Sequence, residues 1–166
     1  MANPNFKENK FKRFIAKSLQ PLFRFVSKKQ YVSLQYRYIT GHKLDWKNLN
    51  RYTEKLQYLR LYYFANNDEV VRSASRIGAR IRVNRHGLGD ILIPLVGIYN
   101  TVSEIDFEKL PFRFVIKATH ASSFVHVCTN KNEEDWPTLK AKLIKWLHID
   151  YWERTVEPHY SKIKPR

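Results

Sequence analysis

The stretch from Pro111 to Thr129, PFRFVIKATHASSFVHVCT, decides the expected fold of this chain. Two runs rich in β-prone apolar residues, 112–116 and 124–129, flank a short loop of small polar residues, 120–123. Two such runs around a short loop are typical of a β-hairpin. We therefore predict a hairpin here and interpret the rest of the chain from it.

Lys117 is the residue of this stretch that points to chemistry. It closes the first run and falls on the strand face opposite Phe112, because successive side chains alternate across a strand. A lysine at a strand end, just before a loop of small residues, suits phosphate binding: the loop brings backbone N–H groups close, and the ammonium adds a point charge. The pattern leaves open a second interpretation, in which the lysine is only solvated.

The length and composition describe a folded protein. A chain of 166 residues with 43% hydrophobic and 14% aromatic residues predicts one domain with a real core and excludes a disordered composition. We expect this domain at residues 45–166, after a basic amphipathic segment at residues 1–44. No internal repeat or low-complexity linker interrupts it.

The charge predicts a polyanionic partner. The formal net charge is +15, and residues 1–44 hold ten Lys or Arg against the single acid Glu8. Nucleic acid, an anionic membrane surface, an acidic polymer and nucleotide phosphates are all candidates.

The first thirty residues predict a basic amphipathic helix with one apolar stripe. Its members are Phe11, Phe14, Ile15, Leu19, Leu22 and Val26, with Pro21 dividing or kinking the helix. Such a helix can lie on an anionic membrane face or pack on the domain with its basic side solvated. Because the chain has one cysteine, no apolar signal-peptide core and no uncharged run of membrane-spanning length, we predict a cytoplasmic protein, with peripheral contact at the inner membrane face as an option.

Three further helices are predicted. Residues 53–63 and 69–86 show helical spacing, and Asp135 with Pro137 opens a helix whose apolar stripe includes Leu139 and Leu143. The aromatics of the first of these helices are interpreted as core. The regular row Arg72, Arg76 and Arg80 on the second is interpreted as a solvated face. Between them and the hairpin, the apolar run 91–99 contains a proline that argues against a regular central strand.

Few other constellations could carry chemistry. His126 and Cys128 share a strand face near His120, but four closely spaced zinc ligands are missing, so no metal site is predicted. The sequence holds no Walker-type lysine loop and no dinucleotide glycine fingerprint. Lys117 and its loop therefore remain the strongest candidate site.

Several short motifs also occur in the order in which one known family has them. They are 53–62 (family EKIQWLKLY), 74–80 (ADK..VR), 92–99 (LIPLLGVYD), 105–120 (IDFDSLP..FVLKCNHGSG), and then Trp146-Leu147, Glu157, His159-Tyr160 and 163–166. Through them the chain resembles the ATP-grasp family of teichuronopeptide and capsular-polysaccharide biosynthesis, some members of which are labelled glycosyltransferases. The resemblance covers roughly residues 31–166.

The resemblance implies an α+β fold: a partial, first-half ATP-grasp-like domain preceded by basic N-terminal helices. It implies a ligase in which ATP phosphorylates a carboxylate and an amine captures the acyl phosphate. Lys117 would neutralise nucleotide phosphate, Arg80 would be its upstream basic partner, and the loop containing His120, Ser122 and Ser123 would close over the phosphates. The implied partners are a nucleotide and a polysaccharide or lipid-linked acidic polymer.

The chain departs from the family in three places. The family loop His-Gly-Ser-Gly is His120-Ala121-Ser122-Ser123 here, which makes any positive φ or close approach to phosphate harder. The aspartate of ADK is Ser75 here. The chain also stops before the family's metal-binding acidic and amide residues, so we expect Mg²⁺ ligands outside this chain and a truncated or degenerate enzyme.

Two alternatives to the ligase stay open. One is a glycosyltransferase-type protein of polysaccharide biosynthesis, although no Asp-x-Asp sugar-nucleotide motif is found. The other is a noncatalytic basic module that binds nucleic acid, or an anionic membrane through residues 1–30.

Overall fold

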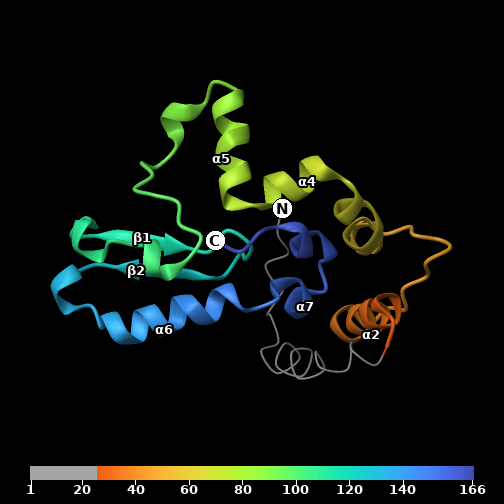
Figure 1. Ribbon diagram of the computed structural model, residues 1–166. Helices are drawn as coiled ribbons and strands as arrows, with labels where there is room; N and C mark the ends of the chain where they lie inside the picture. Colours follow the sequence, from red (N-terminus) through yellow and green to blue (C-terminus); the bar gives the residue numbers. More distant parts are fainter. Residues whose placement is uncertain (1–25) are drawn as a thin grey trace, which may run out of the picture. The chain divides into compact units, whose positions relative to one another are not determined.

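The computed structural model describes residues 26–166, which fold into helices and one two-stranded sheet (Figure 1). The predicted α+β class is confirmed. The chain divides into two compact units between Tyr63 and Phe64, and the predicted boundary after residue 44 stays a prediction. Most of the predicted N-terminal amphipathic helix lies outside the described residues. Within residues 26–166, no helix is long and apolar enough to cross a membrane.

The first unit begins its described part with helix α2, Lys28–Thr40. Ser27 caps this helix by a capping box: its side chain accepts from the Gln30 N–H, while the Gln30 side chain accepts from the Ser27 N–H. The helix ends at Gly41, whose φ of 75° is the left-handed conformation that glycine adopts without a Cβ clash.

Helix α3, Tyr52–Tyr58, continues as a π-helical turn, Leu59–Tyr63. The prediction that the aromatics of this segment are core is wrong for its last three tyrosines, which are 41–50% exposed: Tyr58, Tyr62 and Tyr63. The wider π-helical turn changes the angular spacing, so residues placed one α-helical turn apart no longer share one buried face.

In the second unit, the predicted single helix 69–86 is wrong, because the structure has two helices there. Helix α4 spans Asp68–Ala74 and helix α5 spans Arg76–Arg85. Ser75 between them is extended (φ −72°, ψ 137°), and its hydroxyl accepts from the Gly78 N–H at 3.2 Å. A serine that caps the second helix competes with continuation of the first, and the helix breaks at that residue.

The predicted hairpin is confirmed. Strands β1, Phe114–Lys117, and β2, Val125–Cys128, pair antiparallel, with Phe114 opposite Cys128 and Lys117 opposite Val125. The alternation is also as expected, since Phe114 is buried whereas Val115 and Lys117 are exposed.

Helix α6, Trp136–Leu147, runs along this hairpin (Figure 1). Asp135 caps it by accepting from the Thr138 N–H, as predicted. Its first residue, Trp136, stacks on Phe114, and Trp146 near its end stacks on Phe124 with ring centroids 5.3 Å apart. The helix therefore packs along the hairpin from Phe114 in β1 to Phe124 at the end of the loop.

The remaining elements are short. They are the helical turns Phe64–Asn66, Gly89–Ile91, Val102–Glu104, Phe107–Lys109, Lys131–Glu133 and Pro158–Lys162, and helix α7, Tyr151–Thr155. Residues 92–99 form no strand, as their proline predicted. A core cluster of Ala118, Ala121, Phe124 and Tyr151 joins the hairpin loop to α7.

Candidate functional site

Lys117 is the last residue of β1, at the loop end of the hairpin, and its side chain is exposed. Its strand partner Val125 is the first residue of β2, so the loop 118–124 begins and ends beside this lysine. Among the described residues, no carboxylate forms an ion pair with it. The ammonium is therefore available to an anion from outside the fold.

The loop after Lys117 is held by its own backbone. The Ala118 N–H donates to the Phe124 carbonyl at 3.0 Å, and the Val125 N–H donates to the Ser123 carbonyl at 3.1 Å. Within residues 26–166, the N–H groups of Ser122 and Ser123 donate to no acceptor, and both serines are exposed. Two unpaired N–H groups beside a free lysine are suited to an oxyanion.

His120 lies inside the fold, not on the loop surface. It is 3% exposed, its Nε2 donates to the Trp146 carbonyl at 3.2 Å, and its ring packs edge-on against Phe124. Burial lowers the pKa of this histidine, which favours the neutral ring. His120 therefore holds the loop from its buried side, while Ser122 and Ser123 form its solvent-exposed side.

The two lost glycines do not distort this loop. Val156 is the one non-glycine residue with a positive φ among the described residues. Ala121 and Ser123 therefore do not adopt the left-handed conformation. Ala121 is 2% exposed and packs within the core cluster with Phe124 and Tyr151. Ala121 thus contributes a buried methyl group to the core cluster, which the glycine of the family motif would lack.

Arg76 at the start of α5 braces the loop. Its Nε donates to the Ala118 carbonyl at 3.0 Å and its Nη2 donates to the Ser122 carbonyl at 2.8 Å, while its N–H donates to the Thr119 carbonyl. The interpretation of its arginine row as a solvated face is therefore wrong for Arg76. The break at Ser75 turns α5 so that this arginine meets the loop. The one sequence signal for this role is that Arg76 stands at the lysine position of the family's ADK motif.

We expect Arg76→Met to destabilise the second unit by about 2 kcal/mol, because two charge-assisted hydrogen bonds are lost and the loop carbonyls are left without donors. Urea unfolding followed by tryptophan fluorescence measures this effect. Arg113→Met, at an exposed position without a described partner, is the control and should change the free energy of unfolding by less than about 0.5 kcal/mol. Equal effects of the two variants would contradict the bracing role.

Arg80 is half-buried on α5, and no hydrogen bond or ion pair joins it to Lys117 or the loop in the described part of the chain. The structure therefore brings Lys117, Ser122 and Ser123 together at one end of the hairpin and places Arg80 elsewhere. The arginine that reaches the loop is Arg76, one helical turn earlier.

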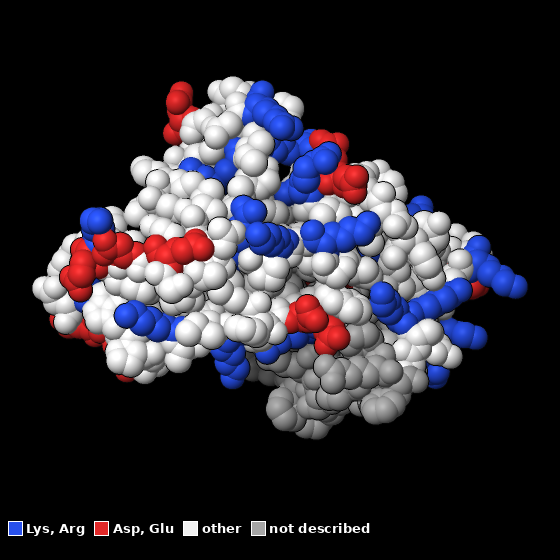
Figure 2. Space-filling view, viewed as in Figure 1, with Lys and Arg blue, Asp and Glu red and all other residues white. Residues whose placement is uncertain are grey.

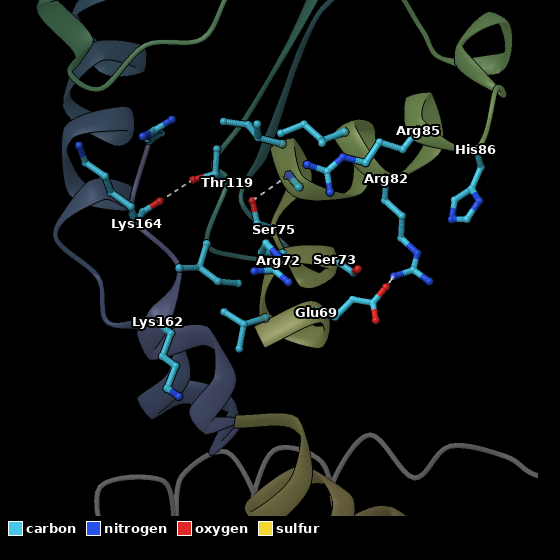
Figure 3. A pocket seen from close by; sticks show the side chains of 16 residues that line it. Glu69, Arg72, Ser73, Ser75, Arg82, Arg85, His86, Thr119, Lys162 and Lys164 are labelled. Atoms are coloured by element: carbon cyan, nitrogen blue, oxygen red, sulfur yellow. Dashed lines mark hydrogen bonds and ion pairs between the residues drawn. The ribbon is translucent and has the colours of Figure 1, made fainter. Parts of the chain in front are cut away.

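A second feature is a cavity of about 410 Å³ between α4, α5 and the C-terminal segment (Figure 3). We call it the basic pocket, because six of its lining side chains are cationic: Arg72, Arg82, Arg85, Lys162, Lys164 and Arg166. Its lining contains one carboxylate side chain, that of Glu69, which pairs with Arg82. Figure 2 shows a hollow bordered largely by Lys and Arg side chains, with acidic groups at one side.

The pocket adjoins the hairpin loop through Thr119. The Thr119 N–H donates to the Arg166 carbonyl at 3.0 Å. The Thr119 hydroxyl donates to the Lys164 carbonyl at 2.8 Å (Figure 3). Ser75, which stands where the family has aspartate, also lines the pocket and caps α5 as an aspartate would. Lys117, Ser122 and Ser123 are not among the lining residues.

Metal binding has no support in residues 26–166, where no group of three or more His, Cys, Asp or Glu side chains could hold an ion. His126 Nε2 instead lies 3.0 Å from a carboxylate oxygen of Glu134. Cys128 is buried, and burial raises the pKa of its thiol. We assign these residues to the packing between β2 and the start of α6.

Comparison with known proteins gives one family. No curated protein and no solved structure matches the chain. A family model described as TupA-like ATPgrasp matches residues 54–166, which include the hairpin, the loop and every residue of the basic pocket. The match covers more than half of the sequence. The chain therefore belongs to the TupA-like ATP-grasp family, whose function is of ATP-grasp type and uses ATP.

Proposed function

We propose that this chain contributes the phosphate-contacting part of an ATP-dependent carboxylate–amine ligase that acts in the biosynthesis of a cell-surface polysaccharide. The observation that carries the proposal is Lys117: an exposed ammonium at a strand end that no described residue pairs with, beside the exposed Ser122 and Ser123, whose N–H groups donate to no acceptor within residues 26–166. Membership of an ATP-grasp family makes the phosphates of ATP the expected ligand of these groups.

The residues at the loop end of the hairpin have different parts in this proposal. The ammonium of Lys117 would neutralise charge on a nucleotide phosphate, and the N–H groups of Ser122 and Ser123 would donate to phosphate oxygens. Arg76 and His120 would hold the loop in place, the first by hydrogen bonds to its carbonyls and the second from within the core. Because the loop is already fixed, little of the binding free energy is spent on ordering it.

The proposed chemistry is that of a carboxylate–amine ligase. The γ-phosphorus–oxygen bond to ADP breaks as a substrate carboxylate oxygen bonds to that phosphorus, which gives an acyl phosphate; an amine then displaces phosphate. Phosphoryl transfer depends chiefly on positioning and on neutralisation of negative charge, and Lys117 supplies one such charge. Within residues 26–166 the chain offers no magnesium ligand set.

The test is binding of Mg-ATP to the full 166-residue chain, measured by isothermal titration calorimetry. We expect Lys117→Ala to weaken binding by about tenfold or more, because one charge-assisted contact to phosphate is removed. Lys145→Ala, at an exposed lysine on α6, removes the same charge from a position outside the loop and should leave the dissociation constant within about twofold.

Equal affinity of Lys117→Ala and the unmodified chain for Mg-ATP would sink the assignment of Lys117. Competition separates the alternatives. A UDP-sugar that displaces ATP through Lys117 would favour sugar transfer, whereas single-stranded DNA binding that falls steeply with salt, together with no ATP binding, would favour a nucleic-acid module.

A further inference from the structure

The basic pocket is not used by the proposed nucleotide site. It is lined by residues of α4, α5 and the C-terminal segment, and it reaches the hairpin only at Thr119. Lys117, Ser122 and Ser123, which carry the nucleotide proposal, do not line it. The pocket therefore needs an explanation of its own.

Its charge is strongly one-sided. Six cationic side chains line one cavity, and the carboxylate among the lining residues is already paired with Arg82. Arg85, Lys162 and Lys164 are exposed and form no ion pair within residues 26–166. Like charges held at one cavity repel one another, and a bound anion with several charges removes that repulsion.

Arg166 gives a second, independent observation. Its side chain lines the pocket, and its Nε is buried without a hydrogen-bond acceptor among the described residues. That Nε is covered by the protein, so a ligand in the pocket acts on the charge of the guanidinium and not on this N–H: a cation partly removed from water is stabilised when an oxyanion lies in the pocket beside it.

The walls of the pocket are fixed before any ligand arrives. The Ser75 hydroxyl caps α5 on one side, and the Thr119 hydroxyl holds the Lys164 carbonyl on the other (Figure 3). The Thr119 N–H also holds the Arg166 carbonyl. The cations therefore project from three held segments. Preorganised charges of this kind bind an anion at a lower entropic cost than cations on mobile segments.

We propose that the basic pocket binds an oxyanionic ligand with several negative charges, and that this ligand is the carboxylate-bearing substrate of the proposed ligase, at a site separate from the nucleotide. The assignment to a substrate rests on the proposed function, whereas the anion site rests on the pocket alone. Cations on three segments around about 410 Å³ fit a chain of carboxylates or phosphates better than a single small anion. No aromatic side chain lines the pocket except the imidazole of His86, so no large ring is offered for an adenine to stack on.

The experiment compares two double variants of the full chain with equal loss of charge. Arg85→Gln/Lys164→Gln removes one arginine and one lysine from the pocket, and Arg113→Gln/Lys145→Gln removes the same pair from exposed positions outside it. The probes are oligogalacturonate as a carboxylate chain, inorganic triphosphate as a phosphate chain, a neutral dextran oligomer and Mg-ATP. Thermal unfolding first confirms that both variants are folded.

We expect oligogalacturonate to bind the unmodified chain with an affinity that falls as salt rises, and dextran not to bind. The pocket variant should lose about tenfold in affinity for oligogalacturonate and keep its affinity for Mg-ATP, while the control variant stays within about twofold. Triphosphate that binds in the pocket more tightly than oligogalacturonate would support the anion site and identify its ligand as a phosphate chain.

Two results would overturn the proposal. Equal losses in the pocket and control variants would show only non-specific attraction to a basic chain. A parallel loss of Mg-ATP and oligogalacturonate binding in the pocket variant would make the pocket part of the nucleotide site. Failure of the proposed function looks different: Lys117→Ala would then leave Mg-ATP binding unchanged while the pocket variant still loses the carboxylate chain.

Discussion

Gly78→Ala is expected to destabilise the second unit by about 3 kcal/mol or more, although glycine to alanine inside a helix usually stabilises by about 1 kcal/mol. A Cβ at Gly78 would lie 1.8 Å from the carbonyl oxygen of Arg72, a backbone atom of the preceding helix. The clash cannot be relieved by rotating a side chain, so α4 and α5 would have to move apart at Ser75. Because both helices line the basic pocket, its cations would move with them.

Urea unfolding followed by tryptophan fluorescence and circular dichroism measures this loss. Gly89→Ala is the matched control: there a Cβ would meet the side-chain oxygen of Asn84 at 2.6 Å, and that side chain can turn away. We expect a change below about 1 kcal/mol for the control. A Gly78→Ala chain as stable as the unmodified one would show that the two helices do not approach as closely as described.

Phe124→Ala is expected to cost about 3–5 kcal/mol. Phe124 is 6% exposed, stacks on Trp146, and meets Tyr151 and His120 edge-on. Its removal opens a cavity at the point where the hairpin loop, α6 and α7 meet, and it takes away the ring against which His120 packs. The loop should therefore lose its fixed conformation together with the stability of the unit.

The control is Phe112→Ala, which removes the same side chain from a position that is 51% exposed. We expect it to cost less than about 1.5 kcal/mol in the same unfolding measurement, since little buried surface is lost. Proteolysis of the native chain with a low protease concentration gives a second readout, because cleavage within 118–124 should increase only in the Phe124 variant. A small effect of Phe124→Ala would contradict its central place in the core.

The elements predicted correctly from the sequence are those set by neighbouring residues. The alternation on both sides of a short loop specified the hairpin, and Asp135 with Pro137 specified the start of α6. The break at Ser75 was missed because the residues on both sides of it continue one helical pattern. The chain forms two helices there because the Ser75 hydroxyl caps the second one. The tyrosines after residue 57 were misplaced because a π-helical turn leaves no signal in an α-helical pattern.

In the candidate site too, groups that are close in sequence could be predicted and groups that are far apart could not. Lys117 and the two loop serines could be grouped from the sequence because they are close in it, and the structure keeps them at one end of the hairpin; their role in binding stays a prediction. Arg76 was missed as a loop partner, and the basic pocket was missed entirely, because both join segments more than forty residues apart. Periodicity along a helix cannot reveal which distant carbonyl its arginine meets.

These long separations have a consequence for the order of folding. Arg76 meets the Ser122 carbonyl across 46 residues, and Thr119 meets the Lys164 carbonyl across 45. Contacts this distant in the chain have a larger loop-closure entropy than a hairpin or a helix, so they form after the local elements. On the ribosome, β1, β2 and α6 can assemble as they emerge, whereas the walls of the basic pocket meet only when residues 164–166 are free of the exit tunnel. The nascent chain thus acquires its lysine-bearing hairpin before it acquires its anion site.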